Sequence, residues 1–232
     1  MKKWLFGKSV FAVLVSLVAS NGIPVTASSH GTNSEGTVRL EENRQTTDPK
    51  NPTDPSRPQQ PDPNNPPTNN RGPLSLDVAP KGFYFGNQKM YHTEHEYQAQ
   101  GKEKHIQYLQ VTDNRDEGIY GWMVKVRQDG YLRDEESGHE LKGAVLTLPK
   151  GEVRNSIDRK ESGLRGESIE ITNEEQTIFS ASADKSVKAG KAASTYFWQS
   201  QEVTLTIPRN TARAGEYSKK IYWILMDGGP EN

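Results

Sequence analysis

Apolar and polar residues alternate with a period of two in several short stretches from residue 74 onwards. This period places successive side chains on opposite faces, as in a β-strand with one buried face. Proline, glycine or another turn residue separates the stretches at short intervals, as at Pro149 and Pro208. The stretches with this pattern are 74–78, 122–126, 144–148, 169–171, 203–207 and 221–225.

Many short strands with frequent stops predict an all-β domain over residues 73–232. We expect an antiparallel β-sandwich of Greek-key or immunoglobulin-like type. The polar segments 151–166 and 181–194 are expected to be loops. Helical spacing is weak and is suggested only around 91–103.

The last predicted strand, 219–227, differs from the others because both of its faces are apolar or aromatic. A strand with one solvated face should alternate more regularly. Two interpretations fit this pattern. Either the strand is central and covered on both sides, or one of its faces meets a partner.

The first 27 residues have the pattern of a secretory signal peptide. Lys2 and Lys3 supply a positive flank, 10–19 is an apolar run, and small residues precede a cleavage site that we place after Ala27. The apolar run is too short for a stable helix across ~30 Å of hydrocarbon. We therefore expect a secreted, extracellular protein without a membrane span after cleavage.

Residues 28–72 are predicted to form a disordered, Asp/Pro-rich linker. Nine of the fourteen prolines of the chain lie between Pro49 and Pro73, and large apolar residues are almost absent after Leu40. Such a stretch buries too little apolar surface to offset the entropy of ordering.

The charge balance and the absence of cysteine exclude several function classes. The 232 residues carry 29 basic and 30 acidic side chains, for a net charge of -1. A strongly basic nucleic-acid-binding surface is therefore disfavoured, and so is attraction to an anionic polymer by net charge. Without cysteine there are no disulfides, thiolate metal sites or cysteine nucleophiles.

No catalytic constellation stands out. The only local histidine cluster is His92-Thr93-Glu94-His95-Glu96, which lacks the helical spacing of a zinc protease. On a strand, His92, Glu94 and Glu96 would share a face that could hold a metal, but an exposed polar edge is the simpler interpretation. We predict no enzyme activity, no cofactor, no catalytic residues and no metal ligands.

Two motifs resemble those of the WxL-domain family of Gram-positive cell-surface proteins. Residues 214–230 contain a Gly-x-Tyr lead, a strand with Trp223-Ile224-Leu225, and an acidic turn before a proline. Upstream, 111–115 followed by 121–124 is similar to the second family motif. Val124 replaces the leucine expected there, and one additional glycine precedes Pro230. The linker and signal peptide also fit, so the resemblance covers essentially the whole chain.

The resemblance implies non-covalent attachment to the Gram-positive cell wall, with peptidoglycan as the ligand. Members of the family are also associated with companion surface proteins, so a protein-binding subunit or adhesin in a multi-protein complex is the alternative. The sequence contains no sorting pentapeptide and no hydrophobic tail, in agreement with non-covalent attachment.

The motif side chains are the candidate binding residues: Trp122, Val124, Tyr217, Trp223 and Leu225. Residues two apart on a strand project to one face, so each Trp pair could form part of an exposed platform for a sugar ring or a partner side chain. Alternatively, the pairs are buried and only position the sheet. We expect the core role, because large aromatic residues at strand period usually face the interior.

Overall fold

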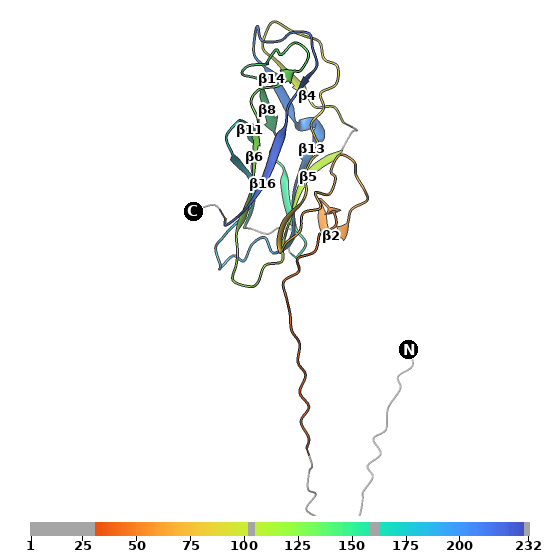
Figure 1. Cartoon of the computed structure of the whole chain (residues 1–232), viewed down its shortest axis with the longest axis vertical. Coiled ribbons are helices and arrows are strands. Elements are labelled where there is room, and N and C mark those ends of the chain that lie inside the picture. Colours follow the sequence, from red (N-terminus) through yellow and green to blue (C-terminus); the bar gives the residue numbers. More distant parts are fainter. Residues whose placement is uncertain (1–30, 102–104, 158–162, 230–232) are drawn as a thin grey trace, which may run out of the picture. The chain divides into compact units, whose positions relative to one another are not determined.

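The computed structural model describes residues 31–101, 105–157 and 163–229. Within them the chain forms sixteen strands, one 3-10 helix and no α-helix, and all strand pairs are antiparallel. The all-β sandwich predicted from the sequence is therefore confirmed (Figure 1). The signal peptide predicted for residues 1–27 lies outside the described residues.

The strands form three four-stranded sheets and two small ribbons. The first sheet has the order β3 (Leu74–Val78), β5 (Ile106–Asp113), β13 (Ala192–Gln199), β9 (Glu152–Asn155). The second is β10 (Leu164–Gly166), β12 (Gln176–Ala181), β6 (Trp122–Gln128), β16 (Ile221–Asp227). The third is β11 (Ile169–Ile171), β8 (Val145–Leu148), β14 (Thr204–Ile207), β4 (His95–Gln98). The ribbons are β1 (Lys50–Asn51) with β2 (Asp54–Pro58), and β15 (Tyr217–Ser218) with β7 (Arg133–Asp134); the 3-10 helix η1 is Ser200–Glu202.

One large apolar core joins the three sheets. The first sheet contributes Leu109, Val111 and Tyr196, and the facing sheets contribute Trp122 and Leu148, all with almost no exposed surface. Burial of side chains of this size is the main term that stabilises such a domain. A second, smaller cluster of Tyr108, Phe197, Val78 and Ile106 lies on the other face of β5 and β13.

The segment 48–68 covers that other face, so the prediction of a disordered linker up to residue 72 is corrected here. Thr195 of β13 donates a hydrogen bond to the Pro52 carbonyl at 2.7 Å, and the Lys50 N–H donates to Gln110 of β5 at 2.7 Å. The proline-rich composition concealed this packing, because the segment is held by hydrogen bonds rather than by large apolar side chains. Residues 31–47 contain no strand or helix.

Asn65 extends the sheet where β3 ends. Its side chain accepts a hydrogen bond from the Tyr108 N–H at 3.2 Å and donates one to the Ile106 carbonyl at 2.8 Å. Both backbone groups belong to β5 beyond the last residue that β3 pairs with. An asparagine amide carries one acceptor and one donor group, so it replaces a missing strand partner there.

Three further expectations can be compared with the structure. The predicted loop 151–166 contains β9 and β10, and 91–103 contains the strand β4 where weak helical spacing was noted. The predicted loop 181–194 is present between the end of β12 and the start of β13. The short strands were missed because they alternate over too few residues to be recognised.

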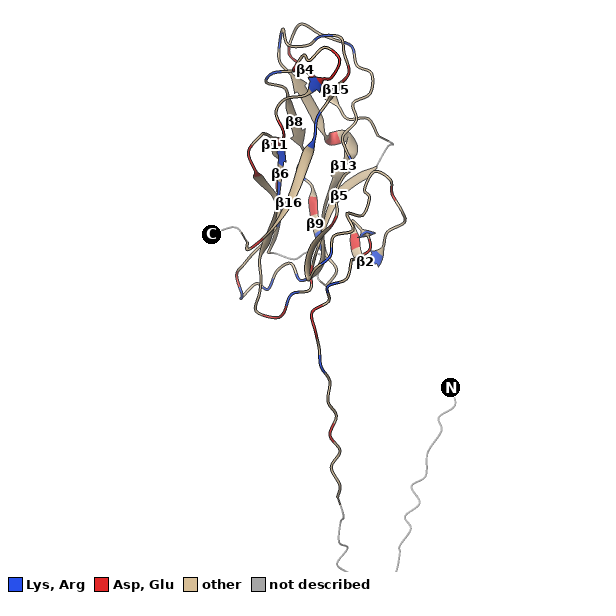
Figure 2. Ribbon diagram, in the orientation of Figure 1, with Lys and Arg blue, Asp and Glu red and all other residues tan. Residues whose placement is uncertain are grey.

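Charged residues of both signs are interspersed over the loops, whereas β5, β13 and β16 are almost uncharged (Figure 2). Among the described residues, no helix has the length and apolar character needed to cross a bilayer.

Candidate functional site

The two strands that carry the tryptophan motifs are neighbours in one sheet. Strand β16 pairs antiparallel with β6, which places Trp223 opposite Val126 and Leu225 opposite Val124. Directly opposite residues project to the same face of an antiparallel sheet. The structure therefore brings the two sequence motifs together as one pair of strands.

The motif residues differ in burial. Trp122 and Val124 have 0% of their surface exposed and belong to the main core, where Trp122 contacts Phe179 edge to face at a centroid distance of 4.8 Å. Trp223 and Leu225 are half-buried and pack against the same core. With this geometry, Trp122 and Val124 support the sheet from inside and offer no surface to a ligand.

Gly190 packs directly against the Trp122 indole. Its Nε1–H donates a hydrogen bond to the Gly190 carbonyl at 3.2 Å. Gly190 has a φ of +78°, and a Cβ built on it would lie 2.6 Å from that indole nitrogen and 2.4 Å from the Cβ of Ala181. Only glycine combines this backbone conformation with so close an approach.

Tyr217 lies in a different cluster from the tryptophans. It pairs with Asp134 in the ribbon of β15 and β7 and packs near Leu141, while its hydroxyl donates to the Arg213 carbonyl at 3.2 Å. The structure therefore does not bring Tyr217 together with Trp223, although both belong to one sequence motif.

The Asp134 carboxylate leaves no room for a side chain at Gly215, the glycine of that motif. The backbone N–H of Glu216 donates to the Asp134 carboxylate at 2.7 Å, and a Cβ on Gly215 would lie 2.8 Å from the same carboxylate. Hydrogen bonds from the hydroxyl and the backbone N–H of Ser137, with that of Glu216, lower the pKa of Asp134. The carboxylate is thus an anchor for the turn that leads into β16.

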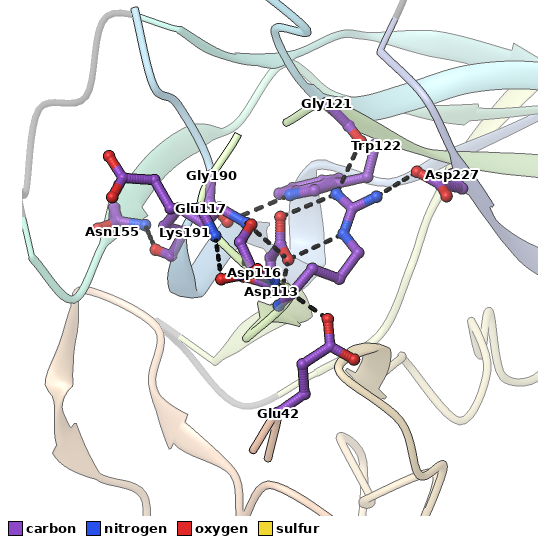
Figure 3. Close-up of polar contacts among 11 residues, drawn as sticks. Glu42, Asp113, Asp116, Glu117, Gly121, Trp122, Asn155, Gly190, Lys191 and Asp227 are labelled. Atoms are coloured by element: carbon purple, nitrogen blue, oxygen red, sulfur yellow. Dashed lines mark hydrogen bonds and ion pairs between the residues drawn. The ribbon is translucent and has the colours of Figure 1, made fainter. Parts of the chain in front are cut away.

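Arg115 connects the ends of the two motifs in a contact network that sequence reasoning did not assign; its partners Asp113, Gly121 and Asp227 are labelled in Figure 3. Its guanidinium donates from Nε and Nη2 to the two oxygens of Asp113, at 3.0 and 2.8 Å, and from Nη1 to Asp227. Nη2 also donates to the Gly121 carbonyl at 2.9 Å. Asp113 is buried, so this paired arrangement satisfies a carboxylate inside the protein.

Lys191 adds a second cation to the same carboxylate. Its ammonium group lies 3.4 Å from Asp113 and donates to the Arg115 carbonyl at 2.9 Å. The sequence Asp113-x-Arg115 was the available signal, because an aspartate side chain commonly accepts a hydrogen bond from the backbone two residues on, and here the Arg115 N–H donates to Asp113 at 3.0 Å.

The additional glycine near the carboxyl end is also accommodated by close packing. A Cβ on Gly121 would lie 2.5 Å from the Gly229 backbone nitrogen, and one on Gly229 would lie 2.6 Å from the Ala183 nitrogen. The Gly228 N–H donates to the Gly121 carbonyl at 3.2 Å. The backbone just before β6, at Gly121, therefore lies directly against the backbone just after β16, at 228–229, with no side chain between them.

Strand β16 is an edge strand, so the interpretation of a central, doubly covered strand is wrong. Within the described residues it is paired only with β6. Its outer face carries Tyr222, Ile224 and Met226, and the Arg127 guanidinium lies 4.5 Å above the Tyr222 ring. Long basic side chains of β6 thus cover part of an apolar face.

The histidine cluster forms no metal site in the described part of the chain. His92, Glu94 and Glu96 are exposed, and Glu96 lies on β4, an edge strand of its sheet. No group of three or more potential metal-binding side chains is found among the residues that the structure describes.

Comparison with known proteins assigns the chain to a family. The family model described as "WxL domain surface cell wall-binding" matches residues 27–228, which include the packed segment 48–68, the upstream motif and all but the last two residues of the terminal motif. No curated protein and no solved structure matches the chain. The chain therefore belongs to the WxL domain family of surface proteins, and its domain binds the cell wall.

Proposed function

We propose that the chain is exported by the signal peptide over residues 1–27 and attaches non-covalently to the peptidoglycan of a Gram-positive cell wall. The observation that carries this proposal is the extent of the family match, which includes nearly all of the described domain. In this proposal the domain as a whole is the attachment module, and no catalytic step is required.

Charge favours the neutral glycan of peptidoglycan over an anionic wall polymer. Without the three lysines of the proposed signal peptide, 26 basic and 30 acidic residues remain, for a net charge of -4, and both signs are interspersed over the surface loops (Figure 2). Such a surface generates little long-range attraction for a polyanion. Attachment then rests on short-range contacts made by accessible side chains rather than by the buried Trp122 and Val124.

The test is co-sedimentation of the purified mature chain with protein-stripped, polymer-free peptidoglycan sacculi. We expect the chain to sediment with the sacculi and to remain bound at raised salt, because screening weakens only charge-driven binding. Failure to sediment with bare sacculi would contradict the proposal.

A protein-binding role is the second candidate, and the position of β16 favours it. An edge strand with apolar residues on both faces can accept a strand or an apolar side chain of a partner. Met226 on its outer face is 38% exposed. Retention on intact cells, or with a companion surface protein, combined with no retention on bare sacculi, would favour this alternative.

A further inference from the structure

A cavity of about 230 Å³ lies near the start of β5, away from both tryptophan motifs. Its walls come from the segments that follow β2, β3 and β4, from the first residues of β5, and from η1. The residues that matter for its chemistry are Asp62, Phe83, Tyr84, His105, Gln107 and Ser200. All of them belong to the packed domain that begins at Leu40.

Hydrogen bonds between the wall segments fix the shape of the cavity. Each bond joins two different wall segments through a backbone carbonyl. They run from Lys81 N–H to Asn64, from Gln100 N–H to Tyr84, from Ser200 N–H to His105, and from the Gln107 side chain to Gly82. Binding sites for small ligands are usually preformed in this way.

Two polar side-chain atoms in the cavity wall are buried without a partner among the described residues. They are Gln107 Oε1 and Ser200 Oγ, in residues that are 5% and 4% exposed. Because Gln107 Nε2 donates to the Gly82 carbonyl at 2.9 Å, the amide orientation is fixed and Oε1 is the free atom. Buried polar groups are rarely left unsatisfied, so these two atoms are available to pair with a bound group.

The two free atoms have complementary hydrogen-bonding capacities. Gln107 Oε1 can only accept, whereas the Ser200 hydroxyl can donate or accept. Together they match a secondary amide, which has one N–H donor and one carbonyl acceptor. Ala99, which also lines the cavity, offers an apolar contact to a methyl group.

The remaining described wall groups favour a hydroxyl-rich neutral ligand. Among the described residues that line the cavity there is no lysine or arginine, whereas Asp62 is one of them, with His105 Nε2 at 3.2 Å. Partial burial acts to raise the pKa of Asp62, but hydrogen bonds from Asn64 and Asn65 outweigh it and lower the pKa. The carboxylate therefore stays ionised at neutral pH and can accept a hydrogen bond from a hydroxyl group of a ligand.

Aromatic surface lies at the same cavity. Phe83 is half-buried, and Tyr84 is 56% exposed, which is unusual for so large a side chain. An exposed aromatic ring beside buried polar groups is suited to a ligand with one apolar face and polar edges, such as a pyranose.

We propose that this cavity binds the acetamido group of an N-acetylhexosamine unit of peptidoglycan, with Gln107 and Ser200 on the amide and Tyr84 against the sugar ring. The proposal rests on the proposed attachment to peptidoglycan and gives it a site. At about 230 Å³, the cavity is below the ~300–1,000 Å³ of most small-molecule sites, which suits one substituted sugar unit rather than a chain segment.

The test compares two tetrasaccharides by calorimetry or by NMR shift mapping on the mature chain. The N-acetylglucosamine tetramer chitotetraose should bind, and the glucose tetramer cellotetraose, which lacks the acetamido groups, should bind at least about 10-fold more weakly. Equal affinity for the two would overturn the assignment of the acetamido group.

Two substitutions test the site itself. Ser200→Ala should weaken chitotetraose binding about 3- to 10-fold, the effect of one lost hydrogen bond. It should not lower the melting temperature, because the hydroxyl has no partner among the described residues. Tyr84→Ala should also weaken binding, whereas Tyr131→Ala, at a tyrosine that is 39% exposed and does not line the cavity, should not.

Sedimentation with bare sacculi separates this inference from the proposed function. Retention of the wild type, combined with chitotetraose affinity that neither substitution changes, would overturn the cavity and leave peptidoglycan attachment standing. Loss of retention for Ser200→Ala and Tyr84→Ala but not for Tyr131→Ala would support both. Chitotetraose binding that depends on Ser200 but no retention on sacculi would support the cavity and contradict the attachment.

Discussion

Val124 and Leu225 lie directly opposite each other in the antiparallel pair of β6 and β16, on the face that closes the main core. The two sequence motifs of the chain are thus two halves of one structural unit. Three contacts complete that unit at its end: Arg115 pairs with Asp227, the Gly228 N–H donates to Gly121, and the Trp122 indole donates to Gly190. The motif residues are explained by the construction of the domain.

Replacing Gly190 by alanine should destabilise the domain strongly. The new Cβ would meet the Trp122 indole and Ala181, at a φ that L-residues rarely adopt. Overpacking and the positive φ together should lower the free energy of unfolding by roughly 2–5 kcal/mol, measured by urea denaturation. Gly118→Ala is the control, since its φ is +93° but nothing lies within 4 Å. Equal effects of the two substitutions would show that close packing against Trp122 has no role.

The two ion pairs of Arg115 should differ in how much they contribute to the free energy of unfolding. Arg115→Met leaves the buried Asp113 without its main partner and should cost about 3–5 kcal/mol of unfolding free energy. Asp227→Ala should cost less than about 1 kcal/mol, because the side chain of Asp227 is 73% exposed. A larger loss for Asp227→Ala than for Arg115→Met would contradict this ranking.

Regular alternation of apolar and polar residues was the feature that made strands predictable. The stretches around 74–78, 122–126, 144–148, 169–171, 203–207 and 221–225 all contain strands. Strands β5 and β13 were missed because both of their faces are covered, so their sequences do not alternate. Their outer cover is the segment 48–68, whose composition alone favoured disorder.

The candidate site was predictable only in part. The motif residues were identified because the Trp-x-Leu type of spacing can be read directly from the sequence. Their burial could not be predicted in this way, because it depends on which strands are neighbours. Gln107 and Ser200 gave no sequence signal, because an unsatisfied polar atom is defined by its surroundings. Wall segments as far apart in the chain as those of Asp62 and Ser200 must fold together before that cavity exists.

The packed segment should contribute to stability through Asn65. Asn65→Ala would leave the Tyr108 N–H and the Ile106 carbonyl without their side-chain partner, at a cost of about 1–3 kcal/mol in unfolding free energy. Asn43→Ala, at an exposed asparagine before the segment, should change it by less than about 0.5 kcal/mol. No effect at Asn65 would mean that the segment does not complete the sheet in solution.

Asp134 should make stability depend on acid pH. Its pKa is below the ordinary value of 3.8 in the folded chain, so its ionised form stabilises the fold above that value. This contribution is lost as the pH falls through the lowered pKa. Asp134→Asn should therefore lower the melting temperature at pH 7 more than at pH 2, in a thermal scan at each pH. A constant difference between the two proteins would contradict the lowered pKa.

We propose that the tryptophan motifs build the domain and that wall attachment uses other surfaces. The most direct test measures melting temperature and sacculus affinity together for Trp223→Ala, the half-buried motif tryptophan. We expect a loss of unfolding free energy somewhat below the ~3–5 kcal/mol of a fully buried Trp, and wild-type affinity for sacculi below the lowered melting temperature. Lost affinity at an unchanged melting temperature would instead place Trp223 in the attachment surface.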